Sequence, residues 1–131
     1  MGDELDSLIR DQIVPFHLRN VEALGAKHPH IMGMVNSVMA NQENRAAIRI
    51  QEQGKIVGEY TFLLKGLKIE TVESNTLDPQ FQHPFLGKIK PFVTLERTVL
   101  EKVLADDKNY LEEPFSAVVP YLSEITIQFL P

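Results

Sequence analysis

The stretch Glu124-Ile125-Thr126-Ile127-Gln128-Phe129 near the end of the chain alternates strictly between polar and apolar residues. Successive side chains of a β-strand point to opposite faces of its sheet, so Ile125, Ile127 and Phe129 would share one face. Such alternation is typical of a sheet with one dry side and one side in water. We therefore expect helices to cover the dry side of a sheet that ends with this strand.

Three earlier segments alternate in the same way and are joined by short turns. Residues 46–52 are followed by Gln53-Gly54-Lys55, where the glycine can take the positive φ of a hairpin turn. Residues 56–65 form the longest expected strand, and residues 67–73 form the third. The short connections predict an antiparallel meander of these three strands.

The next part of the chain combines a loop, a strand and two helical patterns. Residues 74–88 show neither period and predict a crossing loop with room for a short helical turn. Residues 89–95 predict a fourth strand, in which Pro91 would limit the first half to a sheet edge or an irregular segment. Residues 96–105 have an apolar stripe at helical spacing, and Glu112-Glu113-Pro114 is typical of the start of a further short helix.

The first third of the chain has the helical period. Apolar residues recur every three or four positions from Asp3 onwards, and Pro15 should kink or divide this helix near Val14. Gly25 is a typical helix end, and Pro29 suits the first position of a second helix. The expected buried face of the second helix consists of Ile31, Met34, Val35, Val38 and Met39.

Together these patterns predict an α+β protein with five strands in a mostly antiparallel sheet and helices packed on one face. At 131 residues the chain has the length of a single domain. We expect one domain over residues 1–131. Its helical lead would span residues 1–44, and the sheet with its covering helices would span residues 45–131.

The composition argues against several functional classes. The formal net charge of −5 disfavours binding to nucleic acid or to an anionic membrane surface, since both require a surplus of Lys and Arg. The lack of cysteine excludes disulfides, thiolate catalysis and cysteine-ligated metals. The acidic N-terminus is unlike a secretion signal, and no apolar run approaches the roughly 18–20 residues of a membrane span. We therefore expect a cytoplasmic protein with no integral membrane association.

Two stretches resemble the sterol carrier protein type 2 family of lipid-binding domains. Pro91-Phe92-Val93-Thr94-Leu95 running into residues 96–104 is similar to the family's strand that leads into a helix with a Leu-rich inner stripe. Residues 45–69 are similar to the family's opening meander. The chain departs from the family at residues 118–125, where a Gly-rich stretch is usual, and it stops at Pro131, whereas the family commonly has a C-terminal helix that closes one end of its ligand tunnel. The resemblance implies the fold described above and non-enzymatic binding of a fatty acyl or sterol-like ligand between sheet and helices.

A site of this kind would be lined by apolar side chains from inward strand faces and helix stripes. The expected ligand-binding residues are Ile50, Tyr60, Phe62, Leu100, Leu104, Phe115, Val118 and Ile127. The alternative is an ordinary close-packed core without a cavity. Met32, Met34 and Met39 are adaptable enough to line an irregular ligand, but we interpret them as gap fillers. A buried Tyr60 hydroxyl requires a hydrogen-bond partner, which we interpret as structural.

Other chemistries have less support in the sequence. His28 and His30 flank Pro29, but two imidazoles without an acid at suitable spacing predict no metal site, and we expect no cofactor. The chain has no Gly-x-Ser-x-Gly, phosphate-loop or His-Glu-x-x-His motif.

Two alternatives to a lipid-binding function stay open. One is an interaction module that forms a homodimer through the edge of the third or last strand. The other is a small lyase or isomerase that uses one Asp and one Tyr, although no inward strand position carries such an acid.

Overall fold

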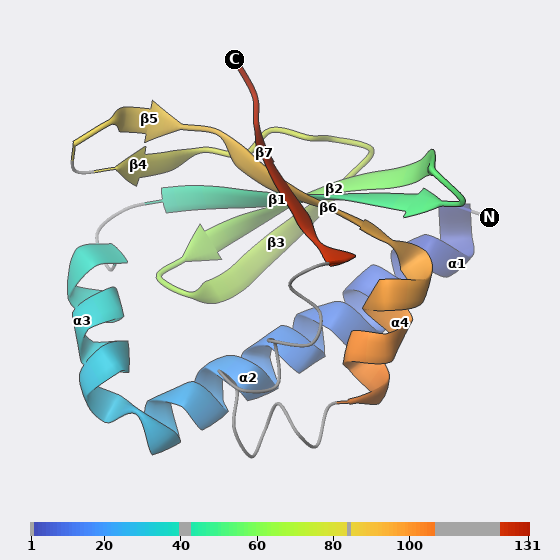
Figure 1. The fold of residues 1–131 in the computed structure, drawn as a ribbon. Helices are drawn as coiled ribbons and strands as arrows, with labels where there is room; N and C mark the ends of the chain where they lie inside the picture. The colour runs from blue at the N-terminus through green and yellow to red at the C-terminus, as the bar shows by residue number, and fades with distance from the viewer. Residues whose placement is uncertain (1, 40–42, 84, 107–123) are drawn as a thin grey trace.

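The structure, a computed structural model, describes residues 2–39, 43–83, 85–106 and 124–131. In chain order, its elements are α1 (Gly2–Ser7), the π-helix η1 (Leu8–Ile13), α2 (Val14–Lys27), α3 (Pro29–Met39), β1 (Glu43–Glu52), β2 (Lys55–Lys65), β3 (Lys68–Ser74), β4 (Phe81–His83), β5 (Gly87–Ile89), β6 (Pro91–Glu96), α4 (Arg97–Ala105) and β7 (Thr126–Phe129). Figure 1 shows the helices on one side of the main sheet. The short helix expected after Glu112 lies outside the described residues.

The main sheet has five strands in the order β3-β2-β1-β6-β7. β1 pairs antiparallel with β2 and parallel with β6, while the β2–β3 and β6–β7 pairs are antiparallel. The predicted α+β class, the mostly antiparallel sheet and the meander of the first three strands are therefore confirmed. The parallel pair arises because the chain crosses over between β3 and β6, so that β6 runs beside β1 in the same direction.

β6 is an interior strand of the main sheet, between β1 and β7, and this corrects the sheet edge or irregular segment expected for its first half from Pro91. Pro91 is the first residue of β6 and pairs with Phe129 of β7. At the first position of a strand a proline interrupts little of the hydrogen-bond ladder. The crossing segment also differs from the expected loop, because β4 and β5 form a separate antiparallel hairpin. Gly87 supplies the positive φ, 75°, at the start of β5.

The helix break expected at Pro15 is a change of helix type. The Val14 N–H donates to the Ile9 carbonyl five residues earlier, which is the hydrogen-bond spacing of a π-helix. Pro15 then lies at the start of α2. A proline inside an α-helix cannot donate a hydrogen bond and clashes with the carbonyl four residues before it, and the wider turn relieves this conflict.

The boundary between α2 and α3 lies at His28, so the expected end at Gly25 is wrong. Pro29 opens α3 as predicted, and its ring disfavours helical geometry at the residue before it. Gly25 instead faces Met32, whose Cγ would lie 3.7 Å from a Cβ at that position. The expected buried face of α3 is only partly formed, because Ile31 and Met34 are 40% and 69% exposed.

The core lies between the inner face of the sheet and helices α1, η1 and α4. Its buried members are Leu5, Ile9, Ile50, Tyr60, Phe62, Leu64, Leu95, Val99 and Leu100. On the opposite face of the sheet, the buried hydroxyl of Thr61 donates to the Thr76 carbonyl and accepts from the Asp78 N–H. These bonds hold the segment between β3 and β4 against β2.

Candidate functional site

Four of the eight expected ligand-binding residues meet in one buried cluster. Ile50, Tyr60 and Phe62 point from β1 and β2 toward the helices, and Leu100 joins them from α4. Leu104 is half-buried on α4, and Phe115 and Val118 lie outside the described residues. Ile127 differs from the expectation: it is 65% exposed on β7, at the edge of the sheet.

The end of the inner face near α1 is filled by the protein's own side chains. Gly58 leaves a gap in the side-chain row of β2, and Leu5 of α1 fills it. A Cβ added to Gly58 would lie 2.5 Å from Leu5 Cδ2 and 3.0 Å from Tyr60 Cε2. Leu5 and Ile9 are themselves buried against Ile50 and its neighbours. Close packing of this kind is that of an ordinary protein interior.

The other end of the helical layer, where α2 meets α3, is more open. All of α2 is described, and none of its 14 residues is fully buried. Leu18, in the middle of its apolar stripe, is 41% exposed. A cavity of about 240 Å³ lies here, lined by Val21, Glu22, Met32, Lys65, Leu67 and Lys68. These residues belong to α2, α3, the end of β2, the start of β3 and the turn between these two strands.

A polar contact fixes the turn between β2 and β3 to α2. His17 Nε2 lies 2.6 Å from the Leu67 carbonyl oxygen. A carbonyl oxygen only accepts hydrogen bonds, so Nε2 carries the proton and donates it. This bond holds the backbone of Leu67 beside α2 while its side chain lines the cavity.

The rim of this cavity is cationic. Lys65 and Lys68 lie directly opposite each other in the β2–β3 register, and both are exposed. Like charges directly opposite on paired strands repel each other. Among the described residues neither ammonium group forms an ion pair, and Glu22 is the acidic residue of the lining. An apolar floor below two ammonium groups suits a molecule with an apolar chain and an anionic head.

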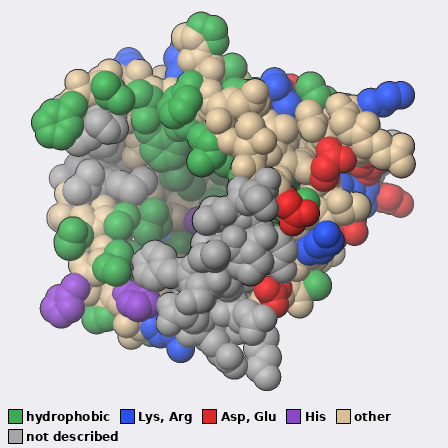
Figure 2. Space-filling model, in the orientation of Figure 1, with side chains coloured by type: hydrophobic (Ala, Val, Ile, Leu, Met, Phe, Trp, Pro, Cys, Tyr) green, Lys and Arg blue, Asp and Glu red, His purple; other side chains and the backbone are tan. Residues whose placement is uncertain are grey.

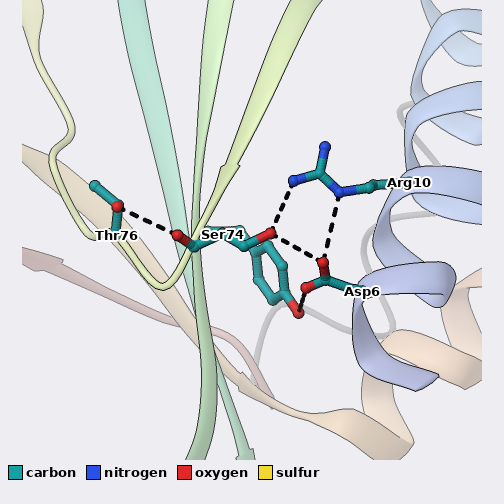
Figure 3. Close-up of polar contacts among 5 residues, drawn as sticks. Asp6, Arg10, Ser74 and Thr76 are labelled. Carbon is teal, nitrogen blue, oxygen red and sulfur yellow. Dashed lines mark hydrogen bonds and ion pairs between the residues drawn. The ribbon is translucent and has the colours of Figure 1, made fainter. Parts of the chain in front are cut away.

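A polar cluster lies where α1 and η1 meet β2 and β3 (Figure 3). The Tyr60 hydroxyl donates to Asp6 Oδ1 at 2.8 Å, and the Ser74 hydroxyl donates to Asp6 Oδ2 at 3.1 Å. Arg10 donates to Ser74 Oγ at 2.8 Å and lies 3.6 Å from Asp6 Oδ2. The hydrogen bond expected for Tyr60 is therefore present, and its acceptor is an acid supplied by a helix.

This cluster is unsuited to proton transfer at neutral pH. The hydrogen bond from Tyr60, with that from Ser74 and the charge of Arg10, holds the pKa of Asp6 below its ordinary value. Burial, followed by the bond to Asp6, raises the pKa of the Tyr60 phenol well above its ordinary value. A general acid or base works best when its pKa is near the working pH, and these two pKa values move away from neutrality. We interpret the cluster as a clamp that holds the first helix to the sheet.

The described residues contain neither a metal-binding cluster nor a membrane-spanning helix. In that part of the chain, no three His, Asp or Glu side chains are close enough to hold a metal ion. No helix in the same part is both long and apolar enough to cross a bilayer.

Sequence reasoning missed most of the cavity lining. Met32 was considered as a wall residue but interpreted as a gap filler, whereas it lines the cavity. Val21 continues the helical period of the first third of the chain, but this period does not indicate which part of the sheet the helix faces. Lys65 and Leu67 flank a predicted turn, and nothing in their local pattern indicates that this turn reaches α2.

The fold is an α+β domain with a five-stranded mixed sheet that is covered by helices on one face. No protein-family model matches the chain. No curated protein matches it in sequence.

Two similar solved structures are crystal structures of sterol carrier protein-2 like-3 and of sterol carrier protein 2 like 2, both from Aedes aegypti. The first is 17% identical with a TM-score of 0.38, over 78% of this chain and 85% of that chain. The second is 16% identical with a TM-score of 0.36, over 82% of this chain and 85% of that chain. Similarities this low do not indicate a ligand for this chain.

Proposed function

We propose that this protein binds a fatty acid in the cavity between α2, α3 and the β2–β3 turn. The observation that carries the proposal is the combination of an apolar floor, formed by Val21, Met32 and Leu67, with the two lysines at the rim. The acyl chain would lie on the floor, and the carboxylate would lie between Lys65 and Lys68. The negative charge would relieve the repulsion between the two ammonium groups.

The driving force would be the burial of apolar surface, which contributes roughly 25 cal/mol per Å². The cavity of about 240 Å³ is somewhat smaller than the about 300–1,000 Å³ of typical small-molecule pockets. Only part of a long acyl chain would therefore fit without a shift of α2 or α3. A more open groove of about 430 Å³ lies along the same pair of elements, α2 and β3, and has Val14, Ile69 and Val72 in its lining. The rest of the chain would lie there.

This proposal keeps the apolar ligand expected from the sequence and changes its position. The expected site centred on Tyr60 and Leu100, which belong to the packed end of the inner face. The cavity lies at the opposite end of α2, where the helix has exposed apolar surface to lose on binding. Phe62 and Leu64 connect the two regions along the inner face of β2.

A pair of tryptophan substitutions on α3 tests the site. The chain contains no tryptophan, so each variant has a single tryptophan whose emission reports on one position. Met32→Trp places the indole in the cavity, and Met34→Trp places it on a side chain position that is 69% exposed. On titration with oleate we expect a clear, saturable change in the emission spectrum of Met32→Trp, because its indole lies in the cavity. We expect little change for the control Met34→Trp, because oleate binding does not alter the surroundings of its exposed indole.

The two variants should also differ in affinity. The larger indole fills the cavity, so Met32→Trp should bind a fluorescent fatty acid at least several-fold more weakly than Met34→Trp, which should match the unmodified protein. Native mass spectrometry of the unmodified protein should show one bound fatty acid. Equal affinities for the two variants, or no fatty-acid complex at micromolar protein, would remove the proposal.

A further inference from the structure

The turn between β4 and β5 exposes two large apolar side chains at its tip. Phe85 is 92% exposed and Leu86 is 70% exposed, and these are the two most exposed large apolar side chains among the described residues. β4 and β5 form a two-stranded sheet of their own, separate from the main sheet. Figure 1 shows this hairpin at the rim of the molecule, with its turn pointing outwards. The turn is therefore a convex, apolar projection.

The sequence segment that contains this hairpin has a charge opposite in sign to that of the whole chain. From Pro79 to Leu95 the sequence contains Lys88 and Lys90 and no acidic residue, although the formal net charge of the chain is −5. In Figure 2 hydrophobic side chains gather at the end that carries β4 and β5, whereas the acidic side chains in view lie toward the α4 end, together with Lys and Arg side chains. Glu43, at the start of the neighbouring β1, is exposed and lies opposite Lys65 in the strand register.

We propose that the β4–β5 turn docks this protein onto an anionic lipid bilayer, with Phe85 and Leu86 inserted between the headgroups. Aromatic and aliphatic side chains on a projecting turn reach the boundary between headgroups and acyl chains, and adjacent lysines are attracted to anionic lipids. The bilayer fits better than a protein partner because a convex tip needs a surface that can close around it. The net charge of −5 disfavours such a surface, but the charge is unevenly distributed, and the segment from Pro79 to Leu95 carries two lysines and no acidic residue.

Docking by this turn does not depend on the proposed fatty-acid site, which is lined by other residues. If both proposals hold, the turn brings the protein to a membrane from which a fatty acid can be extracted. The test below uses vesicles and mutations of the hairpin, whereas fatty-acid binding is measured in solution without vesicles. Failure of one proposal is thereby distinguishable from failure of the other.

The experiment is co-sedimentation of the full chain with vesicles of phosphatidylcholine, with and without phosphatidylserine. We expect binding to the anionic vesicles and weak binding to the neutral ones. Phe85→Ser with Leu86→Ser should lower the vesicle partition coefficient at least tenfold, since burial of such side chains supplies the affinity. Ile56→Ser is the control. It changes an apolar side chain that is 54% exposed at the start of β2, outside the hairpin, and it should have no effect.

The lysines are tested by a second pair of variants with equal net charge. Lys88→Gln with Lys90→Gln should weaken binding to anionic vesicles by about fivefold per lysine and should leave binding to neutral vesicles unchanged. Lys27→Gln with Lys55→Gln removes the same charge away from the hairpin and should have little effect. No binding to anionic vesicles, or equal losses for both lysine pairs, would overturn the proposal. A concentration-dependent mass in light scattering that Phe85→Ser with Leu86→Ser abolishes would also overturn it, in favour of contact between two copies.

Discussion

The hydroxyl of Tyr60 donates a hydrogen bond of 2.8 Å to a carboxylate oxygen of Asp6, 54 residues earlier in the chain. Leu5, the residue before Asp6, packs into the gap that Gly58 leaves on the same strand. One polar and one apolar contact at neighbouring positions therefore fix the first helix to the longest strand. The open end of the helical layer begins only after this anchored segment, where α2 has no fully buried residue.

The first prediction concerns acid stability and Asp6. Its pKa is lowered in the folded protein, so the charged carboxylate stabilises the fold above its ordinary pKa of 3.8, and this contribution is lost as the pH falls through the lower folded value. Asp6→Asn lacks the charge at every pH. We expect the variant to be less stable than the unmodified protein at neutral pH, and the two urea midpoints to converge as the pH falls below 3.8.

Tyr60→Phe provides the matched control for this prediction. It keeps the ring in the core and removes the hydrogen bond that lowers the pKa of Asp6 most. The pKa of Asp6, followed by the NMR shift of its side-chain carboxyl carbon, should rise toward the ordinary value. An unchanged pKa in Tyr60→Phe would show that the bond to Asp6 is weak in solution and would contradict the role of the clamp.

The second prediction concerns the contact between Gly58 and Leu5. In Gly58→Ala the new Cβ would lie 2.5 Å from Leu5 Cδ2, and Leu5 is buried and has little room to move. We expect a loss of about 1–3 kcal/mol in the free energy of unfolding, measured in urea. Gly33→Ala is the control, because nothing lies within 4 Å of its Cβ position in α3. Alanine is the better helix former, so this change should stabilise the fold by about 0.5–1 kcal/mol.

A double substitution separates the clash from other effects at Gly58. Leu5→Ala removes the side chain that the new Cβ would meet. If the clash is the cause, Gly58→Ala should cost clearly less in the Leu5→Ala background than in the unmodified protein. Equal costs in both backgrounds would show that Leu5 does not limit the space at residue 58.

The main sheet was predictable because alternation reports burial directly. Ile48 and Ile50 mark β1 in the sequence, and the glycine turns mark both ends of β2. The first residues of β1 were missed because they are polar. Asn44 is 3% exposed, and its side-chain oxygen accepts a hydrogen bond from the Gln82 N–H of β4. Its burial thus depends on a hairpin 38 residues away, which no local pattern reports.

The candidate site was less predictable because it depends on how the helices dock. The sequence indicates which side chains of β2 face inwards, but it does not indicate which end of that face a helix will fill. One signal was available: Gly58 interrupts the inward row of apolar residues on β2, and a glycine within a strand often marks a close approach of another segment. That approach is made by Leu5, and it leaves the cavity at the opposite end, beside Met32.

The third prediction concerns the outer face of the sheet. Thr61 is 1% exposed, and its hydroxyl donates to the Thr76 carbonyl and accepts from the Asp78 N–H. Thr61→Val keeps the shape and leaves both backbone groups without this partner, so we expect a loss of about 1–3 kcal/mol in unfolding free energy. Thr71→Val on the exposed face of β3 should stay within about 0.5 kcal/mol. Equal effects would contradict a structural role for the Thr61 hydroxyl.

The last prediction separates the anionic head of the proposed ligand from its apolar chain. Lys65→Gln with Lys68→Gln removes both rim charges and leaves the floor of Val21, Met32 and Leu67 in place. Both lysines are exposed to solvent, which screens their charges, so the affinity for oleate should fall by about two- to fivefold per lysine. The affinity for oleyl alcohol, which has the same chain and no charge, should not change.

Glu22 supplies the opposite change at the same rim. Its carboxylate repels an anionic head, so Glu22→Gln should increase the affinity for oleate while leaving that for oleyl alcohol unchanged. Both shifts should shrink at high salt, since exposed charges are screened within about a Debye length of 10 Å at 0.1 M. Displacement of a fluorescent fatty acid measures the affinities of both variants and of the unmodified protein for oleate and for oleyl alcohol. If the lysine and glutamate variants shift oleate and oleyl alcohol alike, the rim acts through packing, and the carboxylate does not lie between Lys65 and Lys68.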